Sequence, residues 1–242
     1  MPTSASVDET RPRSRYAAGL PAVTPDRIVA TAMTLTSEHG LENWTLRQLA
    51  SGVGAYPAVI YHHVGDREAV VAAVIERVVG EWAVPAEELP WREWFDQLLT
   101  QGRPVLRRHP GVARRVALHG PLVQSAHRII DPGVRVLQGA GFGDDSVPVY
   151  TLLLNAACMF VALEDDRETK RGRPVERDPS DLPGLVALVS YLDRADLSDE
   201  FAYSIARTLD GVAARLATLH SGPHLPYNAF SSVQVMPSAT EL

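Results

Sequence analysis

Hydrophobic residues recur at helical spacing through most of the chain, and no stretch alternates with the period of two that marks a β-strand. The clearest example is the segment 70–82. Its apolar positions are Val70, Val71, Val74, Ile75, Val78, Val79 and Trp82. Pro85 and Pro90 follow and cannot continue a helix. The pattern therefore predicts an all-α fold, with a long helix that ends near residue 82.

Shorter elements precede this helix, and each has a recognisable start. Thr24 can cap a helix that has Pro25 in its first turn and ends at His39-Gly40. Thr45 can cap a short second helix, which Gly52 and Gly54 stop. Gly54 can adopt the positive φ that a tight turn needs.

A third helix follows this turn directly. Pro57 suits its first turn, Val59 and Ile60 are its apolar positions, and Gly65-Asp66 ends it. Two short helices joined by a tight turn, between one helix and a longer capped one, are typical of a helix-turn-helix, whose second helix lies in the DNA major groove. An ordinary helical hairpin is the alternative interpretation.

The remainder of the chain is also predicted to be helical. The expected helices are 91–108, 112–119, 122–138 with an interruption at 131–133, 147–166, 182–194 and 198–220. Helix 147–166 is apolar almost all round, so no face is suited to solvent. Helix 198–220 has a stripe of Phe201, Ile205, Leu209, Val212, Leu216 and Leu219, with alanines beside it. Segment 165–181 is charged and contains prolines, which predicts a loop.

Composition narrows the class of protein. A chain of 242 residues can bury a full core, and its single cysteine, Cys158, excludes a disulfide framework and a cysteine-rich zinc site. We expect no membrane span, because no stretch of about 18 apolar residues lacks polar interruptions. Residues 1–10 lack the apolar core of a signal peptide, which favours a cytoplasmic location.

Net charge does not by itself indicate DNA binding. The chain has a net charge of −6, and residues 1–82 contain seven arginines and nine acidic residues. Attraction to phosphate must therefore come from local placement of charge. Arg47 and Arg67 flank the predicted recognition helix, which contains no acidic residue, and protonation of His62 or His63 would add to them.

The chain resembles the tetracycline repressor (TetR) family of bacterial transcription regulators. The resemblance spans about residues 24–82 and rests on Gly40-Leu41, Thr45-Leu46-Arg47-Gln48-Leu49-Ala50, Val53-Gly54, Ile60-Tyr61-His62-His63-Val64 and Asp66-Arg67-Glu68-Ala69-Val70. It implies an N-terminal helix-turn-helix domain and a C-terminal helical bundle for ligand binding and dimerisation. We expect a flexible arm at 1–22, the DNA-binding domain at 23–82, the second domain at 83–220 and a tail at 221–242.

The resemblance also implies which residues contact DNA. Thr45, Tyr61 and Arg67 match positions that bind phosphate, and Arg47 matches an arginine that reads guanine; a phosphate contact is the alternative for Arg47. Tyr56, Pro57 and Ala58 open the recognition helix and are expected to face base edges, near His62 and His63. Leu46 and Val59 depart from the pattern, because relatives often have threonine there.

Members of the family couple DNA release to a small ligand, and two long apolar helices suit a homodimer. The alternative to the dimer is that both helices are buried within one monomer. The predicted ligand pocket lies between helices 91–108 and 147–166. The candidate ligand-binding residues are Trp94, Gln97, Leu98, Gln101, Val105, His119, Asn155, Met159, Phe160 and Glu164. These residues suit an apolar ligand with a few polar contacts.

We expect no resident metal or cofactor. A weaker alternative is a ligand that brings a divalent cation, because His119-Gly120 and Leu163-Glu164-Asp165 are similar to metal–drug segments of the tetracycline repressor. Catalysis is not expected, because the chain lacks G-x-S-x-G, H-E-x-x-H and P-loop patterns, and Cys158 lies in an apolar helix where a thiol is inert. The prediction is a ligand-responsive repressor that binds a palindromic DNA operator as a homodimer. A helical ligand-binding protein without DNA-binding activity is the alternative.

Overall fold

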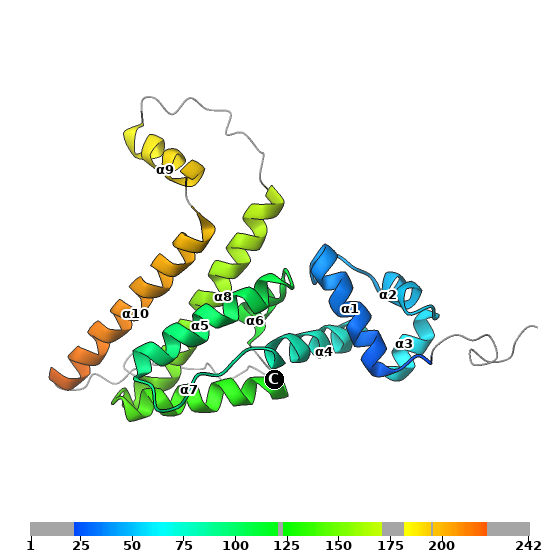
Figure 1. Ribbon diagram of the computed structural model, residues 1–242, viewed down its shortest axis with the longest axis horizontal. Coiled ribbons are helices and arrows are strands. Elements are labelled where there is room, and N and C mark those ends of the chain that lie inside the picture. The colour runs from blue at the N-terminus through cyan, green and yellow to red at the C-terminus, as the bar shows by residue number, and fades with distance from the viewer. Residues whose placement is uncertain (1–21, 121–122, 171–181, 195, 222–242) are drawn as a thin grey trace, which may run out of the picture.

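The computed structural model describes residues 22–120, 123–170, 182–194 and 196–221, and all the regular structure within these ranges is helical (Figure 1). The all-α prediction is therefore confirmed. The elements are α1 (Pro25–His39), α2 (Leu46–Gly52), α3 (Pro57–His63), α4 (Arg67–Gly80), α5 (Trp91–Arg107), α6 (Val112–His119), η1 (Gln124–Ala126), α7 (His127–Gly139), η2 (Gly143–Asp145), α8 (Ser146–Lys170), α9 (Pro183–Arg194) and α10 (Leu197–Ser221). The predicted arm at 1–22 lies outside the described residues except for Ala22, and the predicted tail lies outside them except for Ser221.

The first helices begin at the capping residues that the sequence predicted. The side chains of Thr24, Thr45 and Asp66 each accept a hydrogen bond from the backbone N–H three residues later, at the starts of α1, α2 and α4. Gly54 has a φ of 67° in the turn between α2 and α3. The helix-turn-helix geometry therefore follows from local sequence signals.

A small core holds α1 to α4 together. Leu41, Trp44 and Ile60 are at most 1% exposed, and the Nε1–H of Trp44 donates to Thr36 Oγ1 at 2.9 Å. The apolar stripe of α4 is buried against this core, as its periodicity predicted. Trp82 follows α4 and is buried against the second domain, so α4 leads directly from one domain into the other.

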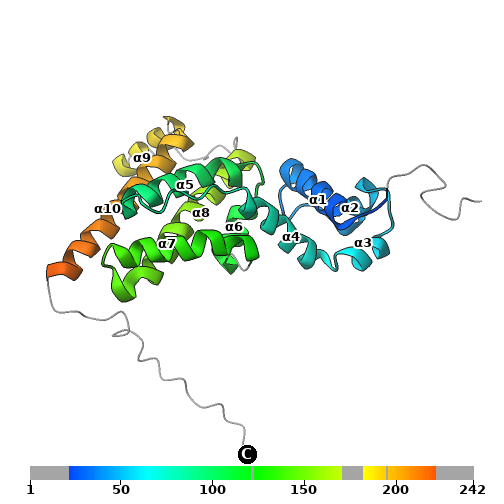
Figure 2. The ribbon, with the colours of Figure 1, turned by 60° about the horizontal axis from the view of Figure 1, so that its bottom comes forward.

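Helix α8 runs through the middle of the second domain, packed by α5, α6, α7 and α10 (Figures 1 and 2). The segment Gly143–Arg167 is long and apolar enough to cross a membrane by length and composition alone. Thr151 and Asn155 interrupt its apolar run, and the expectation that the chain has no membrane span stays a prediction. Packing explains the composition, because a helix surrounded by four others needs apolar residues on several faces.

The boundaries of two helices differ from the sequence expectation. Helix α7 runs without interruption through Pro132 and Gly133, both buried. A Cβ atom on Gly133 would lie 2.7 Å from the Tyr150 ring, so glycine lets α7 pack closely on α8. Helix α8 continues to Lys170, past the predicted end at 166, and residues 171–181 of the expected loop lie outside the described residues.

Helix α9 has little contact with the rest of the described chain. None of its residues is buried, and its exposed apolar side chains include Val186, Leu188, Tyr191 and Leu192. Figure 1 shows it apart from α8 and above the N-terminal end of α10. Its apolar surface is therefore available to another molecule.

Candidate nucleic-acid interface and effector cavity

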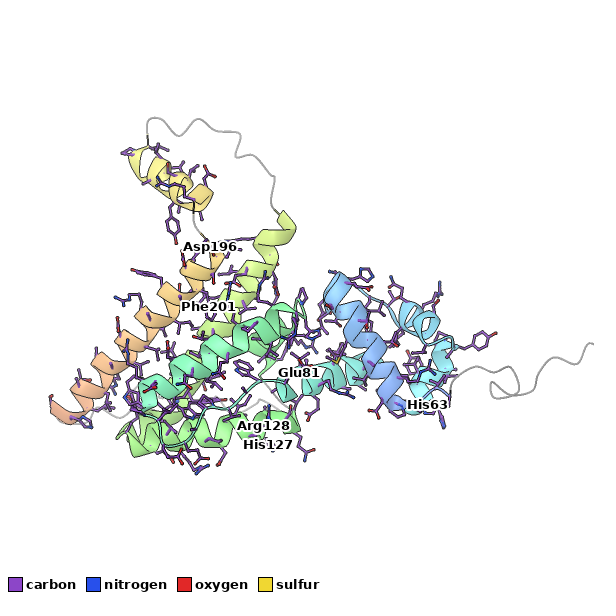
Figure 3. The ribbon with its side chains drawn as sticks, in the orientation of Figure 1. His63, Glu81, His127, Arg128, Asp196 and Phe201 are labelled. Carbon is purple, nitrogen blue, oxygen red and sulfur yellow. The ribbon has the colours of Figure 1, made fainter. Side chains whose placement is uncertain are left out.

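Helix α3 presents nearly its whole surface to solvent. Ile60 is its only buried residue, which anchors the helix to the first core. Tyr56 is 78% exposed and Tyr61 is 55% exposed. Pro57, Ala58, His62 and His63 are also exposed. Figure 3 shows His63 at the end of the first domain remote from α5 to α10, so this face is unobstructed.

Helix α2 contributes two of the predicted contact residues. Thr45 forms a capping box with Gln48: its Oγ1 accepts from the Gln48 N–H at 3.2 Å, while its own N–H donates to Gln48 Oε1 at 2.8 Å. This role of Gln48 was not predicted, although the T-x-x-Q spacing is a known signal for it. Arg47 is exposed, and in the described part of the chain no acidic group lies within ion-pair distance of it.

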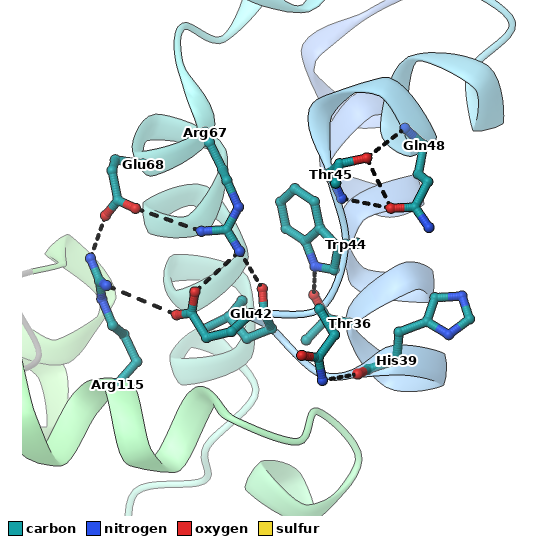
Figure 4. A network of polar contacts seen from close by, with 11 residues as sticks. Thr36, His39, Glu42, Trp44, Thr45, Gln48, Arg67, Glu68 and Arg115 are labelled. Carbon is teal, nitrogen blue, oxygen red and sulfur yellow. Dashed lines mark hydrogen bonds and ion pairs between the residues drawn. The ribbon is translucent and has the colours of Figure 1, made fainter.

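Arg67 has partners inside the protein that the sequence did not reveal (Figure 4). Its Nη2 donates to the Leu41 carbonyl at 3.0 Å and to Glu42 Oε2 at 3.1 Å. Its guanidinium also lies 5.1 Å from the Trp44 ring centroid. The phosphate contact expected for Arg67 stays a prediction, and the structure adds a role in bracing the first domain.

The second domain contains a cavity of about 270 Å³ where the end of α4 meets α6, α7 and α8. Apolar and aromatic side chains dominate its lining, and none of the described lining residues is charged. The lining residues are Val79, Trp82, Val116, Ala117, Gly120, Ala126, Ile129, Tyr150, Thr151, Leu154 and Asn155. Of the residues predicted to line a pocket, only Asn155 does so here.

Helices α5 and α8 pack against each other where a pocket was predicted, and that pocket stays a prediction. Trp94 and Leu98 are fully buried in the core, where Val105 also packs. Glu164 is 4% exposed and accepts from Arg103 Nε at 3.0 Å, while Arg107 Nε lies 3.2 Å from it. Burial raises the pKa of Glu164, whereas the hydrogen bond from Arg103 lowers it. These two arginines hold α5 onto α8 and occupy the carboxylate that a ligand would need.

The other candidate ligand residues are scattered. Gln101 and His119 are exposed, and Gln97 is half-buried beside Glu93. Met159 is exposed on the outer side of α8, and Phe160 packs near α10. His119 therefore does not converge with Glu164, and the described residues contain no group of three or more His, Cys, Asp or Glu side chains placed to hold a metal ion.

The polar groups of the cavity come from one helix. Tyr150, Thr151 and Asn155 all belong to α8. Burial raises the pKa of Tyr150, so its hydroxyl stays neutral and can donate a hydrogen bond. Trp82 does not offer its N–H to the cavity, because Nε1 donates to the Leu98 carbonyl at 2.7 Å. The site therefore suits a ligand that is apolar with few hydrogen-bonding groups.

Comparison with known proteins agrees with this architecture. Residues 28–74, which include α2, α3 and most of α1 and α4, match the family model described as bacterial regulatory proteins, tetR family. This segment is therefore similar to the N-terminal domain of TetR-family regulators. The matched region is the helix-turn-helix domain with the exposed α3 face.

Two relatives extend the TetR likeness beyond that domain. The chain is 26% identical over 205 residues to the class A tetracycline repressor protein from transposon 1721 of Escherichia coli, covering 79% of this chain and 91% of that protein. It is 30% identical over 127 residues to an HTH-type transcriptional regulator of Saccharopolyspora erythraea. That match spans about half of each, 51% of this chain and 52% of the relative.

Solved structures share the TetR fold through both domains. ActR from Streptomyces coelicolor, in complex with actinorhodin, has a TM-score of 0.68 at 23% identity, covering 81% of this chain and 99% of ActR. BioQ from Mycobacterium smegmatis has a TM-score of 0.63 at 21% identity, covering 80% of this chain and 99% of BioQ. These two structures agree with the two-domain helical arrangement.

Proposed function

We propose that this protein is a transcriptional repressor that binds a palindromic DNA operator as a homodimer and leaves it when a small, mostly apolar molecule binds. The position of α4 carries the proposal. Its N-terminal end follows the exposed recognition helix α3, and its C-terminal end, with Val79 and Trp82, forms a wall of the cavity. A ligand in the cavity thus lies against the helix that leads from the DNA-binding face.

DNA binding is supported by the exposed faces of α2 and α3. Arg47 is free to form a bidentate contact with guanine, and Tyr61 has an exposed hydroxyl for phosphate. Tyr56, Pro57 and Ala58 would meet base edges as the helix enters the major groove. Repression is the usual consequence of operator binding in this family, and this role implies a cytoplasmic location.

Dimerisation is supported by apolar side chains that one protomer leaves exposed on α8. Val147 is 57%, Leu152 53%, Met159 42% and Leu163 45% exposed. On α10, Gly211, Ala214 and Ala217 are exposed and would allow close approach of a second helix. Leu209 belongs instead to the protomer's own core at 1% exposure, and Leu216 packs against that core, so the predicted α10 stripe is not the dimer surface.

Sedimentation tests the dimer. Leu152→Glu and Met159→Glu should convert it to a monomer at micromolar concentration, because dimerisation would bury an unpaired charge at a cost of several kcal/mol. Thr100→Glu adds the same charge on the exposed side of α5 and should leave the dimer intact. Monomeric wild-type protein at that concentration would contradict the proposal.

Effector binding is supported by the cavity and by its uncharged lining. ActR, which shares the fold, has been solved with (S)-DNPA and with actinorhodin. We infer that the effector here is a small uncharged molecule with an apolar or aromatic body and a hydrogen-bonding group that meets Asn155 or Tyr150.

Fluorescence anisotropy with DNA from upstream of the protein's own gene tests the function as a whole. Wild-type protein should bind this DNA more tightly than random DNA, and a compound that fills the cavity should weaken binding by about 5- to 150-fold. Equal affinity for both DNAs would favour a helical ligand-binding protein that does not regulate transcription. Unchanged ligand affinity in the presence of saturating operator would exclude the coupling, because coupling is reciprocal.

A further inference from the structure

We propose that Arg115 of α6 is a positioning residue that holds the DNA-binding domain in one orientation against the second domain. The inference rests on the proposed function and adds the contact through which α6 would control the recognition helices. Arg115 pairs with Glu68 at the start of α4, and its Nη1 lies 3.9 Å from Glu42 Oε1 in the loop after α1 (Figure 4). One side chain of the second domain thus reaches two separate segments of the first.

The acids that Arg115 contacts also pair with Arg67. Arg67 lies 3.1 Å from Glu42 and 3.7 Å from Glu68, and it covers the Trp44 ring at the centre of the first core. Two cations and two anions therefore form one network that extends from α6 to the tryptophan. An isolated exposed ion pair contributes little, whereas a network with shared partners fixes geometry better.

Direct backbone contact supports the same joint. The Leu41 N–H, just after α1, donates to the Pro110 carbonyl in the turn before α6 at 2.8 Å. Gly111 has a φ of +89°, and a Cβ atom there would lie 3.2 Å from Leu41 Cβ. The two domains therefore approach so closely at this turn that any shift of the start of α6 must move the loop that contains Glu42.

The same short helix lines the cavity. Val116, Ala117 and Gly120 form part of the cavity wall, and Val116 directly follows Arg115. The start of α6 is in turn tied to α8, because the Gly111 N–H donates to Asp165 Oδ2 at 3.1 Å. A ligand that displaces α6 from the cavity side therefore displaces Arg115 and, through Glu42 and Glu68, the DNA-binding domain.

The spacing of operator half-sites provides a test that needs no known effector. A dimer with rigidly held DNA-binding domains should accept one spacing and bind operators lengthened or shortened by one base pair less tightly. The probe is the palindromic DNA that wild-type protein selects from a random pool, together with both one-base-pair variants. Arg115→Met removes the charge and keeps most of the apolar stem, so the affinity penalty for altered spacing should shrink by about fivefold.

Two variants make the measurement specific. Arg114→Met removes the neighbouring arginine on α6, whose ion pair is with Asp166 of α8, and should keep the wild-type spacing penalty. Arg115→Lys keeps the charge but cannot reach both acids with a forked group, so its penalty should lie between those of wild type and Arg115→Met. Circular dichroism and sedimentation check that each variant is folded and dimeric.

The binding results distinguish failure of the Arg115 role from failure of the proposed function. A spacing penalty in Arg115→Met equal to that of wild type, or equal loss in Arg114→Met and Arg115→Met, would overturn the role of Arg115 while leaving the proposed function intact. If wild-type protein selects no DNA sequence at all, the proposed function fails, and the positioning role fails with it.

Discussion

Gly102 of α5 is the position at which the smallest possible substitution should have a large effect. A Cβ atom built there would lie 2.0 Å from Cε2 and Cζ2 of Trp82 and 2.4 Å from its Nε1. Real Cβ contacts are never this short, and the obstacle is a rigid ring rather than the end of a flexible chain. Gly102→Ala therefore requires Trp82, which is 2% exposed, to leave its site.

The magnitude follows from two contributions. Forcing an extra carbon into a well-packed core costs about 1–3 kcal/mol. Moving Trp82 also breaks the bond from its Nε1–H to the Leu98 carbonyl, and a buried polar group left unpaired costs about 1–3 kcal/mol more. The free energy of unfolding should therefore fall by about 2–6 kcal/mol, a large part of the roughly 5–15 kcal/mol typical of a folded domain.

Urea denaturation at a fixed protein concentration, followed by circular dichroism, measures this change. The control is Gly139→Ala at the end of α7, where a Cβ atom would meet nothing within 4 Å. Alanine is the better helix former, so the control should be neutral or slightly stabilising, by up to about 1 kcal/mol. If the two variants unfold at the same urea concentration, the close approach of Trp82 to α5 does not exist as described. Trp82 also lines the cavity, so a folded Gly102→Ala protein should have altered effector affinity.

Three further predictions concern single side chains. Thr36→Val should lower the free energy of unfolding by about 1–3 kcal/mol in urea, because the buried Nε1–H of Trp44 loses its acceptor; a change below about 0.5 kcal/mol would contradict this. Desolvation by burial lowers the pKa of His109, so below about pH 6.5 the unfolded chain binds a proton that the folded chain does not, and the protein should become less stable as the pH is lowered. His109→Phe should reduce this dependence of stability on pH, measured by thermal melts at pH 7.5 and 5.5. An unchanged dependence in the variant would exclude His109 as its source. Arg47→Ala should cost about 1–3 kcal/mol of discrimination between operator and random DNA in anisotropy titrations, whereas an equal loss on both DNAs would make Arg47 a phosphate contact.

Local signals in the sequence determined the DNA-binding domain. Thr24, Thr45 and Asp66 cap helices through contacts with residues three positions away, and Gly54 sets the turn through its own φ. Val59 and Ile60 were predicted as the apolar positions of α3, and in the structure Ile60 is buried and Val59 is half-buried. These interactions span a few residues, so they can be read without knowledge of the rest of the fold.

The cavity and the joint between the domains depended on tertiary structure. Because α8 is apolar on nearly every side, its sequence does not tell which side meets a ligand, which side meets α5 and which side stays exposed with Met159. The ion pairs that close α5 onto α8 and join the two domains connect residues far apart in sequence. Arg103 and Glu164 are 61 positions apart, and Arg115 and Glu68 are 47 positions apart. Charge pairing at such separation is set by how the helices pack. That packing pairs Glu164, expected to bind a ligand, with two arginines. It also makes Arg115 of α6 one of the contacts between the domains.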